Sequence, residues 1–206
     1  AVLLPLGKLI LTAFIATLIF VCITYLPIIK LIGMKISDYL KGAFEPWLIA
    51  FTTCSSAAAL AVNLEASRKM GASKAIASFA IPLGNTINMN GTSIYMGVTA
   101  VFAAEVFGID LTLAQQFQIV LMGVLAAVGT AGVPGAGLIM TTLVFTEVGI
   151  PLEAVALIAG IDRILDMIRT SVNVLGDSLT ALVVSKSEGV LGTELMDQDT
   201  VVKEQL

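Results

Sequence analysis

The sequence predicts an all-α membrane protein with several transmembrane helices and two re-entrant helical hairpins arranged as an inverted repeat. Three observations support this prediction. Of the 206 residues, 57% are hydrophobic and only 13% are charged, whereas a soluble domain is about 45–50% apolar and about 25% charged. Long stretches carry no charge at all, and two of the apolar stretches are interrupted by segments that cannot remain regular helix.

The uncharged stretches have the length of transmembrane helices. Lys8 and Lys30 enclose 21 uncharged residues, which as a helix span about 31 Å, close to the ~30 Å hydrocarbon thickness of a bilayer. Residues 75–104 and 111–146 form two further uncharged runs. The first run is too long for the apolar region of a signal peptide and is followed by no small-residue cleavage site, so we expect a transmembrane helix over 7–32.

Two interruptions predict the hairpins. A polar patch at 52–56 divides the apolar stretch 39–70, and residues 129–137 contain four glycines and a proline within nine positions. Glycine and proline disfavour helix. Irregular backbone at membrane depth is tolerated only where it is buried in protein or lines a cavity. We therefore expect each stretch to enter and leave the membrane on the same side.

The basic residues agree with this topology. Three lysines precede the first hairpin and three basic residues follow it, and from Ala75 to Ile161 there is no Lys or Arg. Because basic residues favour the cytoplasmic side, both ends of the first hairpin are expected there. The predicted division is a transmembrane helix and cytoplasmic loop (1–37), hairpin 1 (38–73), a broken transmembrane helix (74–109), hairpin 2 (110–150), an amphipathic transmembrane helix (151–187) and an acidic cytoplasmic tail (188–206).

A weak internal repeat accompanies the hairpins. Residues 87–93 resemble residues 172–178, with Asn, Gly and Ser coinciding at an offset of 85 residues. Each copy follows a hairpin, and the two copies are expected to enter from opposite sides. Such inverted repeats with interrupted helices are typical of secondary transporters, in which the binding site lies where the repeats meet. Chance similarity between Gly- and Asn-rich apolar sequences is the alternative.

The composition excludes several functions. There is no histidine and there are only two cysteines, Cys22 and Cys54, so a disulfide framework, a Cys/His zinc site and a His-based catalytic triad are excluded. The 11 basic residues are scattered, which argues against a nucleic-acid partner. The glycine-rich segment lacks the Gly-Lys-Ser/Thr ending of a phosphate-binding loop. We therefore expect no enzyme, and an ion gradient as the source of energy.

The segment 151–186 carries the most specific signal. Its polar residues fall within one ~80° stripe of a helix that is otherwise mostly apolar, namely Asp162, Asp166, Arg169, Asn173 and Asp177. Ionisable groups inside a membrane are costly, at about 2.5–3.5 kcal/mol each, and persist where they bind a ligand or pair internally. A substrate or ion pathway is the favoured interpretation. The alternatives are an exposed helix with an Asp166–Arg169 ion pair and a purely structural polar network. Arg163 falls outside the stripe and receives no role.

The residue types of the stripe suit an amino acid and a hard cation. Asp166 can hold an ammonium group, and Arg169 can bind a carboxylate with two parallel hydrogen bonds. Unpaired backbone N–H groups at the hairpin tips suit an α-carboxylate. Amide, carboxylate and carbonyl oxygens without soft ligands favour Na⁺ over a transition metal; they come from Asn88, Asn90, Asn173, Asp177 and the backbone near Gly91 and Gly176.

From about residue 3 to residue 190 the sequence resembles the dicarboxylate/amino acid:cation symporters, which include glutamate/aspartate transporters and animal excitatory amino acid transporters. The matching motifs are Thr-Cys-Ser-Ser at 53–56, Pro-Leu-Gly-Asn-Thr-Ile-Asn-Met-Asn-Gly-Thr at 82–92, Gly-Thr-Ala-Gly-Val-Pro-Gly-Ala-Gly at 129–137 and Asp-x-x-x-Asp-x-x-Arg-Thr-x-x-Asn-Val-x-Gly-Asp at 162–177. The resemblance implies an elevator-type transport core that covers only the later part of the usual protein.

The resemblance also implies roles for individual residues. Asp166 would take the substrate amino group, and Arg169 with Thr92 the side-chain carboxylate. The full implied substrate set is Ser55, Ser56, Thr92, Val133, Gly137, Asp166, Arg169, Thr170 and Asn173. Two or three Na⁺ sites are implied at Gly84, Thr86, Asn88, Asn90, Ala127, Val128, Thr130, Asn173 and Asp177. Within this set, the first site would use Gly84, Asn88, Asn173 and Asp177, and the second the backbone at Thr86, Ala127, Val128 and Thr130. Asn88 and Asn90 would form part of a third site.

Three positions depart from the family pattern. Asn90 stands where the family typically has Asp, which is expected to weaken the third Na⁺ site. Cys54 stands where many prokaryotic members have Arg, and Met167 where animal members have it. Both versions of a second arginine are therefore missing.

The implied function is secondary active transport of aspartate or glutamate coupled to Na⁺ symport by an elevator movement. Hairpin 2 would be the extracellular gate. The protein would be a multi-pass protein of the plasma membrane and a homotrimer formed through earlier helices, with the bilayer and an acidic amino acid as its partners. The alternatives are a symporter of neutral amino acids or C4-dicarboxylates with altered cation coupling, a channel, and an intramembrane enzyme.

Overall fold

The computed structural model describes residues 3–194, and within this range every regular element is a helix. The prediction of an all-helical chain is confirmed for these residues. Most of the predicted acidic tail, 188–206, lies outside the described residues. Its described beginning folds back, because the Gly192 N–H donates to Gly71 O at 2.8 Å and Glu194 accepts from the Lys74 N–H at 2.9 Å.

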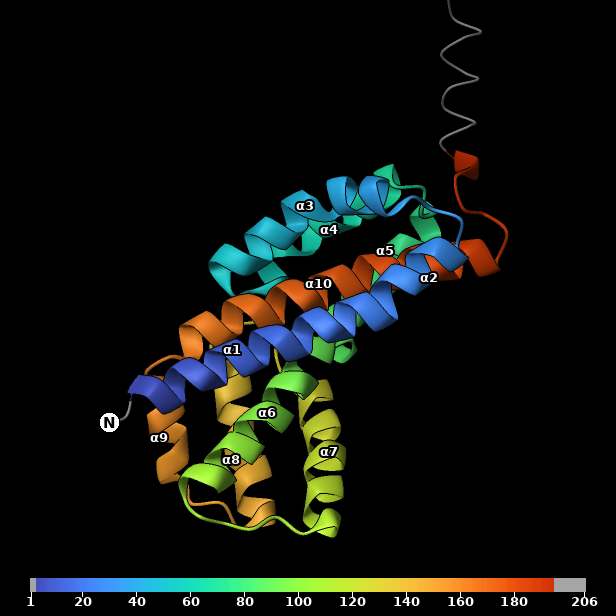
Figure 1. Cartoon of the computed structure of the whole chain (residues 1–206). Coiled ribbons are helices and arrows are strands. Elements are labelled where there is room, and N and C mark those ends of the chain that lie inside the picture. The colour runs from blue at the N-terminus through green and yellow to red at the C-terminus, as the bar shows by residue number, and fades with distance from the viewer. Residues whose placement is uncertain (1–2, 195–206) are drawn as a thin grey trace, which may run out of the picture.

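The chain begins with a long apolar helix. It consists of α1 (Leu3–Phe20), a π-helical turn (Val21–Tyr25) and α2 (Leu26–Leu31). Within the described range, Leu4–Leu31 is the one helix long and apolar enough to cross a membrane. Figure 1 shows that α1 and α2 run beside the long helix α10 (Asp162–Ser187).

The two stretches expected to form hairpins each contain a pair of packed helices, and their re-entry into the membrane stays a prediction. Hairpin 1 consists of α3 (Ile36–Thr53) and α4 (Ser56–Lys69), and its short tip contains Cys54 in the left-handed conformation at φ 57°. Ser55 caps α4 by accepting a hydrogen bond from the Ala58 N–H at 3.1 Å. Hairpin 2 consists of α7 (Leu113–Val128) and α8 (Ala136–Val148), and Gly135 enters α8 at φ 77°.

Each hairpin is followed by an interrupted helix, but the second interruption was not predicted. The first helix breaks at Asn88 and Met89, between α5 (Lys74–Ile87) and α6 (Asn90–Val106). The predicted single helix over 151–187 is wrong, because α9 (Glu153–Ala159) ends at Gly160 and α10 begins at Asp162. Glycine weakens the helix there, and Ile161 leaves the helical region at φ −121°.

The two copies of the sequence repeat occupy different positions relative to the helix breaks. Asn88 lies at the break between α5 and α6, whereas Asn173 lies inside the uninterrupted helix α10. The similarity of 87–93 and 172–178 therefore does not mark equivalent breaks.

Helix α10 connects two hydrophobic cores. One core gathers residues of α1, α6, α7, α8 and α9 around Met96 and Phe145, and the other gathers residues of α2, α3, α5 and α10 around Ile29 and Leu182. In Figure 1 hairpin 1 lies on one side of α10 and the group α6 to α9 on the other. Polar residues along α10 thus lie where both halves of the fold meet.

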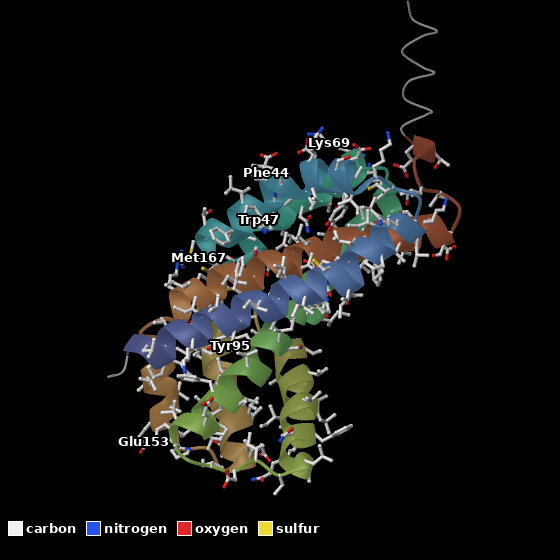
Figure 2. The ribbon with its side chains drawn as sticks, viewed as in Figure 1. Phe44, Trp47, Lys69, Tyr95, Glu153 and Met167 are labelled. Atoms are coloured by element: carbon white, nitrogen blue, oxygen red, sulfur yellow. The ribbon has the colours of Figure 1, made fainter. Side chains whose placement is uncertain are left out.

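Large apolar side chains cover much of the outside. Along α1 and α7 they include Leu11, Phe14, Leu18, Leu113, Phe117 and Leu121, all more than half exposed. On α3, Phe44 and Trp47 stack with ring centroids 5.8 Å apart on the outer side (Figure 2). Such surfaces fit an apolar surrounding better than water.

Candidate functional site

The polar stripe of α10 is buried. The exposed fractions are 6% for Asp162 and 3% for Asp166, Arg169 and Asn173, and Asp177 is 1% exposed. The alternative of an exposed helix with a surface ion pair is therefore wrong. The Asp166–Arg169 ion pair itself exists, with Arg169 Nη2 3.0 Å from Asp166 Oδ2, but it lies in the interior.

Arg169 is held between two carboxylates. Its Nε donates to Asp166 Oδ1 at 3.1 Å and its Nη1 to Asp162 Oδ1 at 3.2 Å. Its guanidinium carbon lies 4.3 Å from the centre of the Tyr95 ring, an arrangement in which the ring face attracts the cation. A guanidinium has five N–H groups, and the contacts with Asp162 and Asp166 use three of them. Two N–H groups are left to bind a carboxylate.

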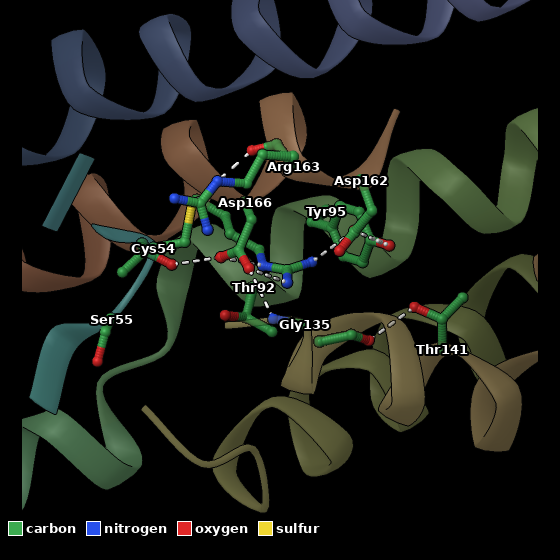
Figure 3. A network of polar contacts seen from close by, with 12 residues as sticks. Cys54, Ser55, Thr92, Tyr95, Gly135, Thr141, Asp162, Arg163 and Asp166 are labelled. Atoms are coloured by element: carbon green, nitrogen blue, oxygen red, sulfur yellow. Dashed lines mark hydrogen bonds and ion pairs between the residues drawn. The ribbon is translucent and has the colours of Figure 1, made fainter. Parts of the chain in front are cut away.

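Asp166 links the arginine to hairpin 2. Besides Arg169, it accepts from the Thr170 hydroxyl at 2.6 Å and from the backbone N–H of Gly135 at 2.9 Å. Figure 3 shows the contact between Asp166 and Gly135 as a dashed line. With the hydrogen bond from Arg169 Nε and the ion-pair contact with Arg169 Nη2, these contacts fill the usual acceptor capacity of a carboxylate. An ammonium group that binds Asp166 must therefore displace one of these donors, and the Gly135 N–H belongs to the hairpin tip.

The tips of both hairpins contact each other beside Asp166 and Arg169. Gly132 O of hairpin 2 accepts from the Ser55 hydroxyl at 2.9 Å and from the Ala57 N–H at 3.2 Å, both in hairpin 1. Behind this junction lies a cavity of about 10 Å³, room for about one water molecule. Of the predicted substrate residues, the cavity is lined by Ser56, Thr92, Val133, Gly137, Asp166, Arg169, Thr170 and Asn173.

The lining contains one unpaired polar atom and one glycine packed directly against Arg169. The Ser56 side chain is 2% exposed and its Oγ has no hydrogen-bond partner, which is costly unless a ligand supplies one. Gly137 lacks a side chain where a Cβ would lie 2.6 Å from Arg169 Cζ. Ser55 does not line the cavity, and its described role is to join the hairpin tips.

Asn173 fastens α10 to the break between α5 and α6. Its Oδ1 accepts from the Gly91 N–H at 2.7 Å, and its Nδ2 donates to Thr92 Oγ1 at 3.0 Å. A Cβ on Gly91 would overlap the backbone of Arg169. The Asn-Met-Asn-Gly-Thr motif therefore allows α6 to begin directly against the substrate residues of α10.

A second polar cluster lies one step further along α10. Asp177 Oδ1 accepts from Asn88 Nδ2 at 2.9 Å, and Gly84 leaves room for this carboxylate, since a Cβ there would lie 2.6 Å from Asp177 Oδ1. Among residues 3–194, the ion pairs found join Lys69 with Glu65 and Arg169 with Asp162 and Asp166, so Asp177 has no basic partner there. A buried carboxylate requires compensation, which a hard cation such as Na⁺ would supply.

The side chains of the four residues expected to form the second Na⁺ site do not form a polar cluster like the one around Asp177. Thr86 and Val128 are exposed, while Ala127 and Thr130 are buried. The hydroxyl of Thr86 donates to Leu83 O, three residues earlier, and that of Thr130 to Ala126 O, four residues earlier. Only backbone oxygens would remain as ligands, and their role stays a prediction.

Sequence reasoning missed three residues that organise the site. Tyr95 donates to Asp162 Oδ1 at 2.9 Å, and Tyr25 donates to Val172 O at 3.2 Å. Arg163, to which the sequence assigns no role, donates from Nη2 to Thr52 O at 2.8 Å and so binds the free carbonyl end of α3. The position of Arg163 immediately beside the stripe is the available signal, whereas both tyrosines come from other helices.

Residues 1–187 match the Sodium:dicarboxylate symporter family. The chain belongs to this family. The predicted resemblance is thereby confirmed, and the family is one of membrane transport proteins rather than enzymes.

Individual relatives of the symporter family agree. The chain is 38% identical over 192 residues to the proton/sodium-glutamate symport protein of Geobacillus stearothermophilus, covering 93% of this chain and 46% of the relative. It is 40% identical over 162 residues to an excitatory amino acid transporter of Caenorhabditis elegans (77% and 32%) and 38% identical over 186 residues to the C4-dicarboxylate transport protein of Bacillus subtilis (89% and 44%). The chain spans less than half the length of these relatives.

Proposed function

We propose that this chain is the substrate- and cation-binding core of a Na⁺-coupled symporter of aspartate or glutamate. The observation that carries the proposal is the buried Arg169, which keeps two N–H groups beyond those bound by Asp162 and Asp166 and borders a cavity between two hairpin tips. A buried guanidinium with unused donors favours a ligand that brings its own carboxylate.

The carboxylate of Asp166 favours an amino acid over a dicarboxylate. An ammonium group can replace the Gly135 N–H at Asp166 Oδ2 and keep this oxygen hydrogen-bonded. A C4-dicarboxylate offers no donor for this position and brings no positive charge to Asp166. A relative is a C4-dicarboxylate transport protein, so a dicarboxylate remains the second candidate.

Coupling to Na⁺ is supported by the chemistry around Asp177. Gly84, Asn88 and Asn173 bring the break between α5 and α6 to this carboxylate, which is 1% exposed. These residues would hold Na⁺ through the Asp177 carboxylate and backbone carbonyl oxygens. When bound, the ion supplies the positive charge that Asp177 lacks. The asparagine and the carboxylate themselves hold the α5–α6 break against α10.

Hairpin 2 is proposed as the gate. The cavity of about 10 Å³ is too small for an amino acid, so one hairpin tip must withdraw to admit it. The tip at 129–135 carries the conformational freedom of its glycines and is held by few polar contacts, Gly132 O to hairpin 1 and Gly135 N to Asp166.

The remaining architecture is proposed by family membership. The two hairpins would be re-entrant, the described helices would move as an elevator, and earlier helices would form a trimer in the plasma membrane. The exposed apolar side chains of α1 and α7 support a surrounding of lipid or further helices.

Binding measurements on the purified protein test the proposal. Titration with aspartate, glutamate, serine and succinate in NaCl and in choline chloride is expected to give tight binding of aspartate or glutamate in NaCl alone. Succinate bound more tightly than both would favour the second candidate, and equal binding in choline chloride would contradict Na⁺ coupling.

A further inference from the structure

The amides around Asp177 have a fixed direction of hydrogen bonding. A carboxylate only accepts hydrogen bonds, so Asn88 must present its Nδ2 to Asp177 Oδ1, 2.9 Å away. Asn88 Oδ1 therefore points to the other side, where Asn90 Nδ2 lies 2.6 Å away. Because an amide oxygen cannot donate, Asn90 has to supply the hydrogen from its nitrogen.

Tyr25 fixes the second hydrogen of the same nitrogen. Tyr25 Oη donates its single hydrogen to Val172 O at 3.2 Å, and its oxygen lies 3.1 Å from Asn90 Nδ2. The phenol oxygen is therefore an acceptor toward Asn90. Both hydrogens of the Asn90 amide are used, and each satisfies an oxygen.

Two backbone features allow Asn88 Oδ1 and Tyr25 Oη to approach each other. A π-helical turn ends at Tyr25 and places this side chain against α10, and π-turns within α-helices are frequent at functional sites. Gly176 of α10 has no side chain where a Cβ would overlap both Asn88 Nδ2 and Tyr25 Oη. Asn88 Oδ1 and Tyr25 Oη both lie within hydrogen-bond distance of Asn90 Nδ2, much as oxygens gather around a hard cation.

We propose that the Asn90 amide nitrogen takes the place of a cation at this point, so that the protein binds one Na⁺ fewer than its Asn90→Asp variant. The expected third site does not fit the residues present, because its centre is occupied by an N–H donor. This inference deepens the proposed function and rests on it for the number of ions coupled to substrate.

An aspartate at position 90 would replace the hydrogen-bond donor with a charged acceptor. Its carboxylate can only accept, so its oxygens would face Asn88 Oδ1 and Tyr25 Oη with no hydrogen between them. Rotating the Asn88 amide does not resolve this conflict, because it would turn an oxygen toward Asp177. A bound cation satisfies all three groups and neutralises the added charge, whereas asparagine satisfies the two oxygens without one.

The test compares aspartate affinity at several Na⁺ concentrations below saturation for the wild type and Asn90→Asp. If two ions are coupled to substrate, each tenfold increase in Na⁺ should tighten binding about 100-fold in the wild type and about 1000-fold in Asn90→Asp. In parallel, the melting temperature without amino acid is measured in NaCl and choline chloride. Na⁺ should stabilise Asn90→Asp more than the wild type.

Tyr25→Phe is the second variant. It removes an acceptor of Asn90 but, under this inference, no cation ligand, so the wild-type dependence on Na⁺ should remain. A shallower dependence would show that the phenol binds Na⁺ and would overturn the inference. So would equal Na⁺ dependence and equal Na⁺ stabilisation of the wild type and Asn90→Asp.

The design separates the two proposals. Absence of aspartate binding by the wild type would refute the proposed function, while the melting temperatures without amino acid would still test Asn90. If Asn90→Asp folds only in NaCl, that result supports the inference. If it folds in neither salt, the Na⁺ dependence of Tyr25→Phe decides.

Discussion

Removal of the Arg169 guanidinium should abolish the preference for an acidic side chain. Each hydrogen bond between charged groups contributes about 1.5–3 kcal/mol, and the two N–H groups left by Asp162 and Asp166 can make two of them. Their loss costs about 3–6 kcal/mol. At about 1.4 kcal/mol per factor of ten, aspartate binding should weaken roughly 100- to 20,000-fold.

Arg169→Cys alone would change both the affinity for aspartate and the stability of the fold, so its effect on binding could not be separated. Breaking a buried ion pair costs about 3–5 kcal/mol, and Arg169 compensates two carboxylates. The change is therefore made in an Asp162→Asn background, which removes one of these charges. Asparagine at 162 still presents an oxygen to the Tyr95 hydroxyl, which donates to Asp162 Oδ1 at 2.9 Å.

The assay is calorimetric titration of Asp162→Asn and of Asp162→Asn/Arg169→Cys with aspartate and serine. The comparison isolates the guanidinium, because both proteins lack the Asp162 charge. The affinity for aspartate should fall roughly 100- to 20,000-fold between the two proteins, whereas the affinity for serine should change much less. Aspartate affinity within about threefold in the two proteins would refute the assignment of Arg169.

Three further perturbations address the other elements of the site. Asp166→Asn should reduce the ratio of aspartate to succinate affinity roughly 10- to 100-fold, since the ammonium loses a charged acceptor; an unchanged ratio would count against this role. Val133→Cys in a Cys22→Ser background should react with an impermeant maleimide from outside and be protected by Na⁺ with aspartate, because Val133 is 51% exposed at the tip of hairpin 2; labelling from the cytoplasm alone would reverse the topology. Arg163→Ala should speed amide hydrogen exchange at the tip of hairpin 1 roughly two- to fivefold, since a cation at a helix C-terminus contributes about 0.3–1 kcal/mol; exchange equal to wild type would remove this role.

Much of the site was predictable because it depends on short-range patterns. Residues four or three positions apart share a helix face, so Asp162, Asp166 and Arg169 could be assigned to one stripe before their contacts were known. Glycines and a proline at 129–137 disfavour helix locally, which placed the tip of hairpin 2. Both signals are contained in a few neighbouring residues.

Other features depend on packing between distant segments. Tyr95 and Tyr25 come from α6 and the π-turn, and nothing in their local sequence indicates that they approach α10. The break at Gly160 follows a single glycine in an apolar stretch, a signal too weak to end a helix reliably. Asn90 was predicted as a weak cation ligand from its lost charge, but its role as a donor follows from the orientation of Asn88 and Tyr25.

The most direct test of the central claim is uptake of radiolabelled aspartate into liposomes containing the purified protein. An inward Na⁺ gradient should drive accumulation of aspartate above its external concentration, and choline in place of Na⁺ should abolish it. Unlabelled glutamate should compete strongly, and serine and succinate weakly. Accumulation that is the same with and without the Na⁺ gradient, or that only succinate inhibits, would contradict Na⁺-coupled transport of acidic amino acids.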